Sequence, residues 1–292
     1  MAYTIAVDAG HGIKTAGKRT PPLPQDMVIG GKIVRKKGEV IHEYEHNVAV
    51  QKRLMEALTR CGQKAVDITV TDTDPALTTR QQRCRAAMCD ASISVHYNAG
   101  RAAVGGVETF WHSNDESTSD RSKALATLAL TEMLKVRNQT NRKVKRDAFA
   151  VCNENSMRCP CILIECGFMD DPRWIEQAYM LDPAYHRDMG EALGKAVCAV
   201  LGVAYVAPGG AVTPAPVAPV PDDDPRPILR KGSKGEAVKR LQTLLNKEGF
   251  GVLAADGDFG PKTDAAVKAA QRANGFEASG VTGAGTWRVL GG

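Results

Sequence analysis

Two histidines stand directly after apolar stretches of the chain, in Val7-Asp8-Ala9-Gly10-His11-Gly12 and in Ser94-Val95-His96-Tyr97-Asn98-Ala99. A histidine at the end of a buried strand, beside small residues, can direct its imidazole into a cleft. A catalytic zinc site combines three nitrogen or oxygen ligands from the protein with one open position for water. The two segments therefore predict a zinc site, provided that the chain also supplies carboxylates.

Carboxylates occur at two places where elements are expected to begin or end. Glu43 and Glu45 open a predicted helix, so their side chains can project from its first turn toward the same cleft. Glu165 ends an apolar strand, and a carboxylate buried there is costly unless it is paired or acts on a metal-bound water. His42 and His46 flank the same helix start, where either one alone is more often a surface histidine than a ligand.

The elements that must position these residues alternate between strand-like and helix-like stretches. We expect strands at Thr4–Asp8, Ala65–Thr71, Ala91–His96, Gly106–Trp111 and Ile162–Glu165, and helices at Glu43–Cys61, Leu77–Met88, Ser117–Val136 and Pro183–Leu201. This order predicts an α/β domain with a twisted, mostly parallel sheet and helices on both faces. Ligands bind such sheets at the carboxyl ends of the strands, where His11, His96 and Glu165 all fall.

Composition divides the chain into three parts. Between Pro208 and Pro227 lie seven of its 15 prolines, and such a segment forms an extended, semi-rigid spacer without a core. We expect a catalytic domain over residues 1–205, a Pro-rich linker over 206–227 and a small all-α domain of three helices over 228–292. The first long loop, Pro21–Lys37, is expected to lie at the rim of the site, with or without a short hairpin.

Overall composition is that of a soluble globular protein, with 43% hydrophobic and 24% charged residues. No apolar run approaches the roughly 20 residues that a membrane span requires. The segment from Ile228 onward holds ten Lys and Arg against six Asp and Glu. Such a basic module suits a polyanion such as cell wall or nucleic acid, although an ordinary solvated surface has the same charge.

Eight cysteines all precede residue 200. No secretory signal is visible at the start of the chain, so we expect synthesis in the cytoplasm and reduced thiols rather than disulfides. A structural zinc at Cys152, Cys159, Cys161 and Cys166 is disfavoured, because the paired Cys-x-x-Cys spacing is missing. Most of the cysteines are expected to be small buried apolar residues.

Four motifs, in order, resemble a known family. They are Val-Asp-Ala-Gly-His-Gly, Glu-x-x-x-Asn at a helix start, Ser-Val-His-x-Asn-Ala and Ile-Glu-x-Gly-Phe, within about residues 4–201. The set resembles the zinc-dependent N-acetylmuramoyl-L-alanine amidases of the Amidase_3 type, which include phage endolysins, autolysins and spore-cortex amidases. The C-terminal segment resembles the peptidoglycan-binding type 1 domain in Leu229–Val238, Asp256–Gly260 and Gly280–Gly283 with Thr286-Trp287.

The resemblance implies Zn²⁺ as cofactor, with the ligands His11, Glu43 and His96 and the catalytic residue Glu165. Glu43 is preferred to Glu45 because the family's ligand lies four residues before the position matched by Asn47. Asn98 matches a position beside the third ligand, where it either holds a polar group of the substrate or stabilises the turn. Arg101 and the loop Pro21–Lys37 depart from the commonest family pattern.

The reaction that the resemblance implies is hydrolysis of the amide between the lactyl group of N-acetylmuramic acid and L-alanine. Zinc would lower the pKa of a bound water toward about 7 and polarise the scissile carbonyl. Glu165 would take the proton from that water and return it to the leaving amine.

The expected role is that of a phage endolysin, made in the cytoplasm and active at the cell wall after release. A bacterial autolysin, a spore-cortex amidase, another zinc peptidoglycan hydrolase such as a carboxypeptidase, and a non-catalytic wall-binding protein are the alternatives. Peptidoglycan is the expected partner, both as substrate and as anchor. Nucleic acid is disfavoured because the few aromatic residues of the C-terminal module are needed for its core and turns.

Overall fold

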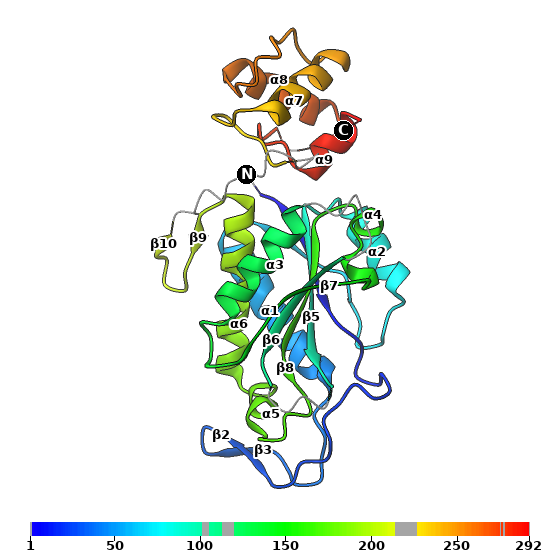
Figure 1. The fold of residues 1–292 in the computed structure, drawn as a ribbon, viewed down its shortest axis with the longest axis vertical. Helices are drawn as coiled ribbons and strands as arrows, with labels where there is room; N and C mark the ends of the chain where they lie inside the picture. Colours follow the sequence, from blue (N-terminus) through cyan, green and yellow to red (C-terminus); the bar gives the residue numbers. More distant parts are fainter. Residues whose placement is uncertain are drawn as a thin grey trace.

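A six-stranded sheet organises the N-terminal part of the chain in the computed structural model (Figure 1), which describes residues 2–100, 105–112, 120–213, 227–274, 276 and 278–291. The strand order is β4-β1-β5-β8-β6-β7. The strands are β1 (Thr4–Ala9), β4 (Lys64–Asp67), β5 (Ala91–Asn98), β6 (Val107–His112), β7 (Asn141–Asp147) and β8 (Cys161–Phe168). Strands β4, β1, β5 and β8 are parallel, whereas β6 pairs antiparallel with β8. The predicted mostly parallel sheet is confirmed.

Helices cover both faces of this sheet, as predicted. One face carries α1 (Glu43–Arg60), α3 (Asp120–Met133) and α6 (Pro183–Leu201), and the other carries α2 (Leu77–Ala86), the short 3₁₀ helix η1 (Ala150–Cys152) and α4 (Glu154–Met157) (Figure 1). Helix α5 (Ile175–Tyr179) follows β8. Helix α6 starts with Asp182 as its N-cap, because the carboxylate accepts a hydrogen bond from the Ala184 amide at 2.9 Å.

The period of two in the central strands separates their side chains into two sets. In β5 the residues Ile93, Val95 and Tyr97 belong to the main core beneath α1, α3 and α6. The alternate residues Ser94 and His96 point to the opposite face, toward α2 and η1. Burial of the Ile93 and Val95 side chains contributes roughly 1.5–3 kcal/mol each. This packing fixes the strand, and with it the direction of the polar side chains on the other face.

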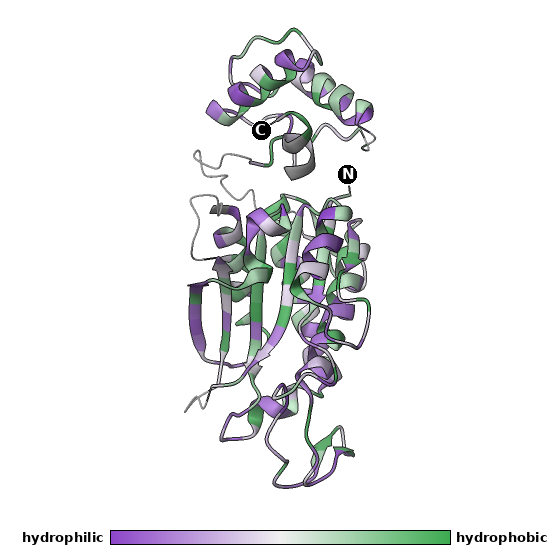
Figure 2. Cartoon of the chain, turned by 90° about the vertical axis from the view of Figure 1, so that its right-hand side faces the viewer, coloured by the Kyte–Doolittle hydropathy of each residue, from purple (hydrophilic) through white to green (hydrophobic). Residues whose placement is uncertain are grey.

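Two elements were not fully anticipated. Strand β7, Asn141–Asp147, consists almost entirely of charged and polar residues and lies at an edge of the sheet, where one purple strand borders the greener inner strands (Figure 2). Its sequence lacks the apolar signal because an edge strand needs little burial. Within the expected loop Pro21–Lys37, a hairpin forms from β2 (Met27–Ile29) and β3 (Lys32–Arg35).

The C-terminal module contains α7 (Glu236–Lys247), α8 (Pro261–Ala273) and α9 (Ala284–Val289), and the three-helix prediction is confirmed. Its core gathers Leu241, Phe259 and Trp287. The module lies at the end of the sheet where the chain begins, opposite the β2–β3 hairpin (Figure 1).

At the start of the expected linker, β9 (Tyr205–Val206) pairs with β10 (Val212–Thr213). Linker residues 214–226, like Arg101, lie outside the described residues. Within the described part, no helix is long and apolar enough to cross a membrane.

All eight cysteines are buried as free thiols, and all lie in the N-terminal part of the chain. Burial raises the pKa of the Cys161 and Cys166 thiols well above its usual range. The Sγ atoms of Cys84 and Cys159 lie 3.7 Å apart in a cluster beneath α2 and α4. The thiols therefore behave as small apolar side chains of the core.

Candidate metal centre

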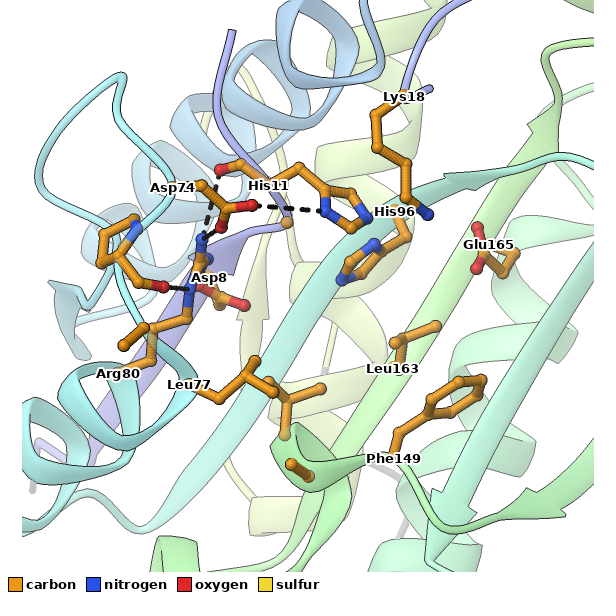
Figure 3. A pocket seen from close by; sticks show the side chains of 15 residues that line it. Asp8, His11, Lys18, Asp74, Leu77, Arg80, His96, Phe149, Leu163 and Glu165 are labelled. Atoms are coloured by element: carbon orange, nitrogen blue, oxygen red, sulfur yellow. Dashed lines mark hydrogen bonds and ion pairs between the residues drawn. The ribbon is translucent and has the colours of Figure 1, made fainter. Parts of the chain in front are cut away.

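Three side chains from separate elements converge at the carboxyl end of the sheet. His11 follows β1, Glu43 opens α1, and His96 lies near the end of β5. One ligand atom of each lies within 4.8 Å of the others, the one such group found among the described residues. His96 Nδ1 is 3.1 Å from Glu43 Oε1, and His11 Nε2 is 3.6 Å from Glu43 Oε2. Both imidazoles face the same space in Figure 3.

The backbone around His11 explains the Ala-Gly-His-Gly sequence. His11 has a φ of 63°, in the left-handed region that residues other than glycine rarely adopt. A Cβ on the preceding Gly10 would lie 2.1 Å from Cε1 of His96. Only glycine allows the strand end to lie against the second imidazole, and the left-handed turn then brings His11 around to face it. Backbone strain of this kind concentrates at functional sites.

Glu43 is a carboxylate in an unusual setting. It is 1% exposed, and its Oε1 accepts hydrogen bonds from the Tyr97 amide at 3.1 Å and from Asn47 Nδ2 at 3.3 Å. Its Oε2 is buried without a hydrogen-bond partner, with Lys18 Nζ 3.8 Å away. Burial raises the pKa of Glu43, but hydrogen bonding and the charges of the two histidines outweigh that effect and hold the pKa below its ordinary value. An ionised carboxylate with one buried free oxygen is suited to bind a cation.

His11 is electrostatically prepared for the same task. Burial lowers its pKa to about 4, although the Glu43 charge opposes the change. The imidazole is therefore neutral near pH 7, and a neutral ring nitrogen is what a metal ligand requires.

Glu165 lies beside this cluster because of strand register. His96 on β5 is paired with Glu165 on β8, and Glu165 is paired in turn with Glu108 on β6. Glu165 is 8% exposed and its Oε2 has no hydrogen-bond partner. Burial raises the pKa of Glu165 well above its usual range, and the nearby Glu43 and Glu108 charges raise it further. A carboxyl group with a raised pKa can both accept and return a proton near neutral pH.

A cavity of about 470 Å³ opens over these groups (Figure 3). Its polar end is formed by His11, Lys18, His96 and Glu165. Its opposite wall is apolar and comes from α2, η1 and β8, with the side chains of Leu77, Phe149, Val151 and Leu163. The cavity thus combines a cation-type cluster and a carboxyl group with a surface for apolar parts of a ligand.

The remaining sequence candidates lie elsewhere. Glu45 accepts a hydrogen bond from the His42 amide at 2.9 Å and pairs with Arg35, so it caps α1. Asn98 donates to Glu108 Oε1 at 2.7 Å, and its Oδ1 accepts from the adjacent Ala99 amide. The side chain of Asn98 does not line the described cavity.

The expectation that His46 is a surface histidine was wrong. It is fully buried, with its ring against Tyr97, Tyr185 and His186, because it lies on the core-facing side of α1.

Three polar residues near the ligands were missed: Asp8, Asp74 and Arg80. A signal was present at Asp8, which interrupts a buried apolar strand.

Comparison with known proteins agrees with this arrangement. Residues 5–199 match the Amidase_3 family, described as N-acetylmuramoyl-L-alanine amidase, and residues 234–290 match a putative peptidoglycan binding domain. A Bacillus subtilis relative, the uncharacterized protein YqiI, is 26% identical over 166 residues, 57% of this chain and 70% of that protein. The zinc D-Ala-D-Ala carboxypeptidase of Streptomyces albus G is 48% identical over 64 residues, 21% of this chain and only 25% of that protein.

Solved structures share the fold of the N-terminal domain. The catalytic domain of CwlV, an N-acetylmuramoyl-L-alanine amidase from Bacillus (Paenibacillus) polymyxa var. colistinus, aligns with a TM-score of 0.54 and 21% identity over 69% of this chain and 99% of that one. AmiC2 of Nostoc punctiforme aligns with a TM-score of 0.52 and 23% identity over 67% of this chain and 94% of that one. On the match over residues 5–199, the chain belongs to the N-acetylmuramoyl-L-alanine amidase family, and it carries a peptidoglycan-binding domain after its catalytic domain.

Proposed function

We propose that this amidase is zinc-dependent and cleaves the amide between N-acetylmuramic acid and L-alanine of peptidoglycan, with Glu165 as the catalytic residue. The observation that carries the proposal is the triad of His11, Glu43 and His96: its two histidines line one end of the cavity beside Glu165, and its carboxylate is buried beneath them.

Zinc fits this triad by the chemistry of its donors. Two imidazole nitrogens and one carboxylate oxygen are a common ligand set of catalytic zinc. Glu43 Oε2, buried without a partner, is the atom that most needs a cation nearby. Zinc bound there would supply a Lewis acid that activates water and polarises the scissile carbonyl.

Glu165 moves the proton in this proposal. Its carboxylate takes a proton from the attacking water and later delivers that proton to the nitrogen of the departing L-alanine. Removal from bulk water raises its pKa, so the acid form needed for the second step persists near neutral pH. Lys18 lies at the same end of the cavity, where its ammonium faces carboxylate rather than apolar surface.

The apolar wall of the cavity supports the choice of substrate. The bond in question lies between a lactyl group and alanine, and each carries a methyl group next to the scissile amide. Leu77, Phe149 and Leu163 offer a surface for these groups. With the two methyl groups on this surface, the scissile carbonyl between them would face the triad of His11, Glu43 and His96.

Digestion of purified peptidoglycan tests the bond and the metal together. Mass spectrometry should show stem peptides with a free L-alanine amino group, and a chelator should abolish them until zinc is restored. Release of a free terminal amino acid would instead show a carboxypeptidase. Glu165→Gln should bind zinc normally and lose at least about 100-fold in turnover, whereas the control Glu45→Gln should stay near wild type in turnover. Wild-type turnover by Glu165→Gln would refute the catalytic assignment.

We further propose a catalytic domain over residues 1–205, a linker over 206–227 and a wall anchor over 228–292, acting together as a phage endolysin. A wall-cleaving domain joined to a wall-binding one supports a role in lysis, because anchoring raises the local concentration of cleavable bonds. Expression in the host cytoplasm should leave cells intact until the membrane is permeabilised. Lysis without permeabilisation would favour an autolysin. Loss of residues after Ala207 should reduce lysis of whole walls more than cleavage of a soluble muropeptide.

A further inference from the structure

A buried arginine lies behind the metal centre and takes no part in the reaction proposed above. Arg80, on α2, is 1% exposed. Its Nη1 hydrogen-bonds Asp8, its Nη2 donates to Asp74 Oδ1 at 3.0 Å, and its Nε donates to the Pro75 carbonyl at 3.1 Å. Further bonds reach the Ala9 carbonyl at 2.8 Å and the His11 carbonyl at 3.2 Å. A guanidinium with every nitrogen bonded is held rigidly, and Figure 3 shows it next to Asp8 and Asp74, on the side of His11 away from Glu165.

One of these carboxylates connects Arg80 to His96. Asp8 and Ser94 are paired across β1 and β5, and Ser94 Oγ donates its proton to Asp8 Oδ2 at 2.6 Å. A hydroxyl has a single proton, so Ser94 Oγ can only accept from His96 Nε2, which is 3.0 Å away. A ring with one proton, the form that can bind a metal, therefore carries that proton on Nε2. The lone pair is left on Nδ1, the nitrogen that faces Glu43.

The other carboxylate connects Arg80 to His11. Asp74 Oδ2 lies 3.8 Å from His11 Nδ1, and Thr15 Oγ1 donates to the same oxygen at 2.9 Å. His11 therefore has a carboxylate on its Nδ1 side, while its Nε2 faces Glu43 at 3.6 Å. The two histidines thus present opposite ring nitrogens to the triad. Behind each histidine lies a carboxylate that accepts a hydrogen bond from Arg80: Asp74 beside His11, and Asp8 through Ser94 for His96.

We infer that Arg80 is a positioning residue for the metal: through Asp8 and Ser94 it fixes His96 to bind zinc by Nδ1, and through Asp74 it fixes His11 to bind zinc by Nε2. A single side chain on α2 thereby orients both imidazole ligands. Partners that bind the second nitrogen of a metal-bound histidine set its tautomer and ring orientation. The inference rests on the proposed zinc dependence, but it concerns which residues prepare the ligands rather than the bond that is cleaved.

Zinc affinity, measured by competition with a chromophoric chelator, tests the inference apart from activity. Arg80→Met should weaken zinc binding at least as much as either Ser94→Ala or Asp74→Asn, which should each lose about 10–100-fold. Ser94 and Asp74 can be changed without removing the buried guanidinium, so these two variants decide the matter if Arg80→Met does not fold.

Arg83→Met is the matched control. Arg83 lies on the same helix and donates to the backbone carbonyls of Ile68 and Thr69, without touching either carboxylate. It should cost stability and leave zinc affinity within about twofold of wild type, well short of the loss expected for a ligand partner. Equal losses in Arg83→Met and Ser94→Ala would show a general structural effect and overturn the inference.

Histidine 15N NMR of the zinc-loaded protein adds a readout that a merely structural role would not move. The wild type should show zinc on Nδ1 of His96 and on Nε2 of His11, and Ser94→Ala should perturb the His96 signals alone. Zinc on Nε2 of His96, or wild-type zinc affinity in both Ser94→Ala and Asp74→Asn, overturns the inference. Failure of the wild type to bind zinc at all would instead refute the proposed function.

Discussion

Gly10→Ala should disable the metal centre while leaving the catalytic domain folded. The added Cβ would lie 2.1 Å from Cε1 of His96 and 2.4 Å from its Nε2. Carbon atoms in contact are normally about 3.5–4.0 Å apart, so the ring must retreat by roughly 1.5 Å. It cannot do so and keep its hydrogen bond of 3.0 Å to Ser94 and its contact of 3.1 Å with Glu43.

The size of the effect follows from this displacement. Metal–ligand distances tolerate changes of only about 0.2 Å, so one of the three proposed zinc ligands is lost. A misplacement of about 1 Å at a catalytic site costs on the order of 100-fold in rate. Forcing an extra carbon into a packed region costs about 1–3 kcal/mol, less than the roughly 5–15 kcal/mol by which a domain is normally stable. The variant should therefore fold, bind zinc poorly and turn over at least about 100-fold more slowly.

The assay compares three quantities in wild type, Gly10→Ala and Gly100→Ala: urea unfolding, zinc affinity and turnover of a soluble muropeptide. Gly100 is a suitable control because the nearest atom to its added Cβ would be Phe168 Cε1 at 3.9 Å, an ordinary contact. Gly100→Ala should match the wild type in zinc affinity. Wild-type zinc affinity and turnover in Gly10→Ala would refute the reasoning that His96 is fixed in place.

Three other perturbations have defined outcomes. Burial lowers the pKa of His46, whose ring nitrogens have no hydrogen-bond partner. The unfolded chain therefore binds more protons than the folded one, and the domain loses stability as pH falls below about 6.5. His46→Leu should flatten this pH dependence of stability in urea unfolding between about pH 5 and 7, and an unchanged slope would contradict the reasoning. Glu108→Gln removes a charge that raises the pKa of Glu165, so the acid limb of kcat/KM against pH should move to lower pH, and a shift to higher pH would contradict the assignment. Trp287 is 0% exposed, and its Nε1 donates to the Pro227 carbonyl at 2.7 Å. Trp287→Ala should lower the stability of the C-terminal module by about 3–5 kcal/mol and abolish sedimentation of the protein with insoluble walls. A parallel loss of soluble muropeptide turnover would show that the module does more than anchor.

The parts of the site that were predictable are those specified by short segments of chain. His11 and His96 could be located because each follows an apolar strand, and parallel strands bring their carboxyl ends together. Glu165 could be located because a carboxylate at the end of an apolar strand is conspicuous. In these cases the local pattern and the sheet topology agree, and few alternative positions exist.

The parts that were not predictable depend on contacts between distant segments. Arg80 lies 72 positions from Asp8, and no local pattern shows that the two side chains meet. From its place at the helix start alone, His46 is more often a surface histidine than a ligand, yet its ring packs against Tyr97 and His186 in the core. Strand β7 was missed because its stability comes from pairing with β6 rather than from burial of its own side chains.

Because all eight thiols of the catalytic domain are buried, their reactivity measures how often that domain opens. A thiol-reactive reagent attacks the thiolate, and Cys161 and Cys166 are held inside the fold with raised pKa values. Labelling therefore waits for the surrounding structure to open, as amide hydrogen exchange does. Because the C-terminal module contains no cysteine, the rate at which labels appear reports openings of the catalytic domain alone. Native-state labelling followed by mass spectrometry would thus measure the stability of one domain inside the intact chain.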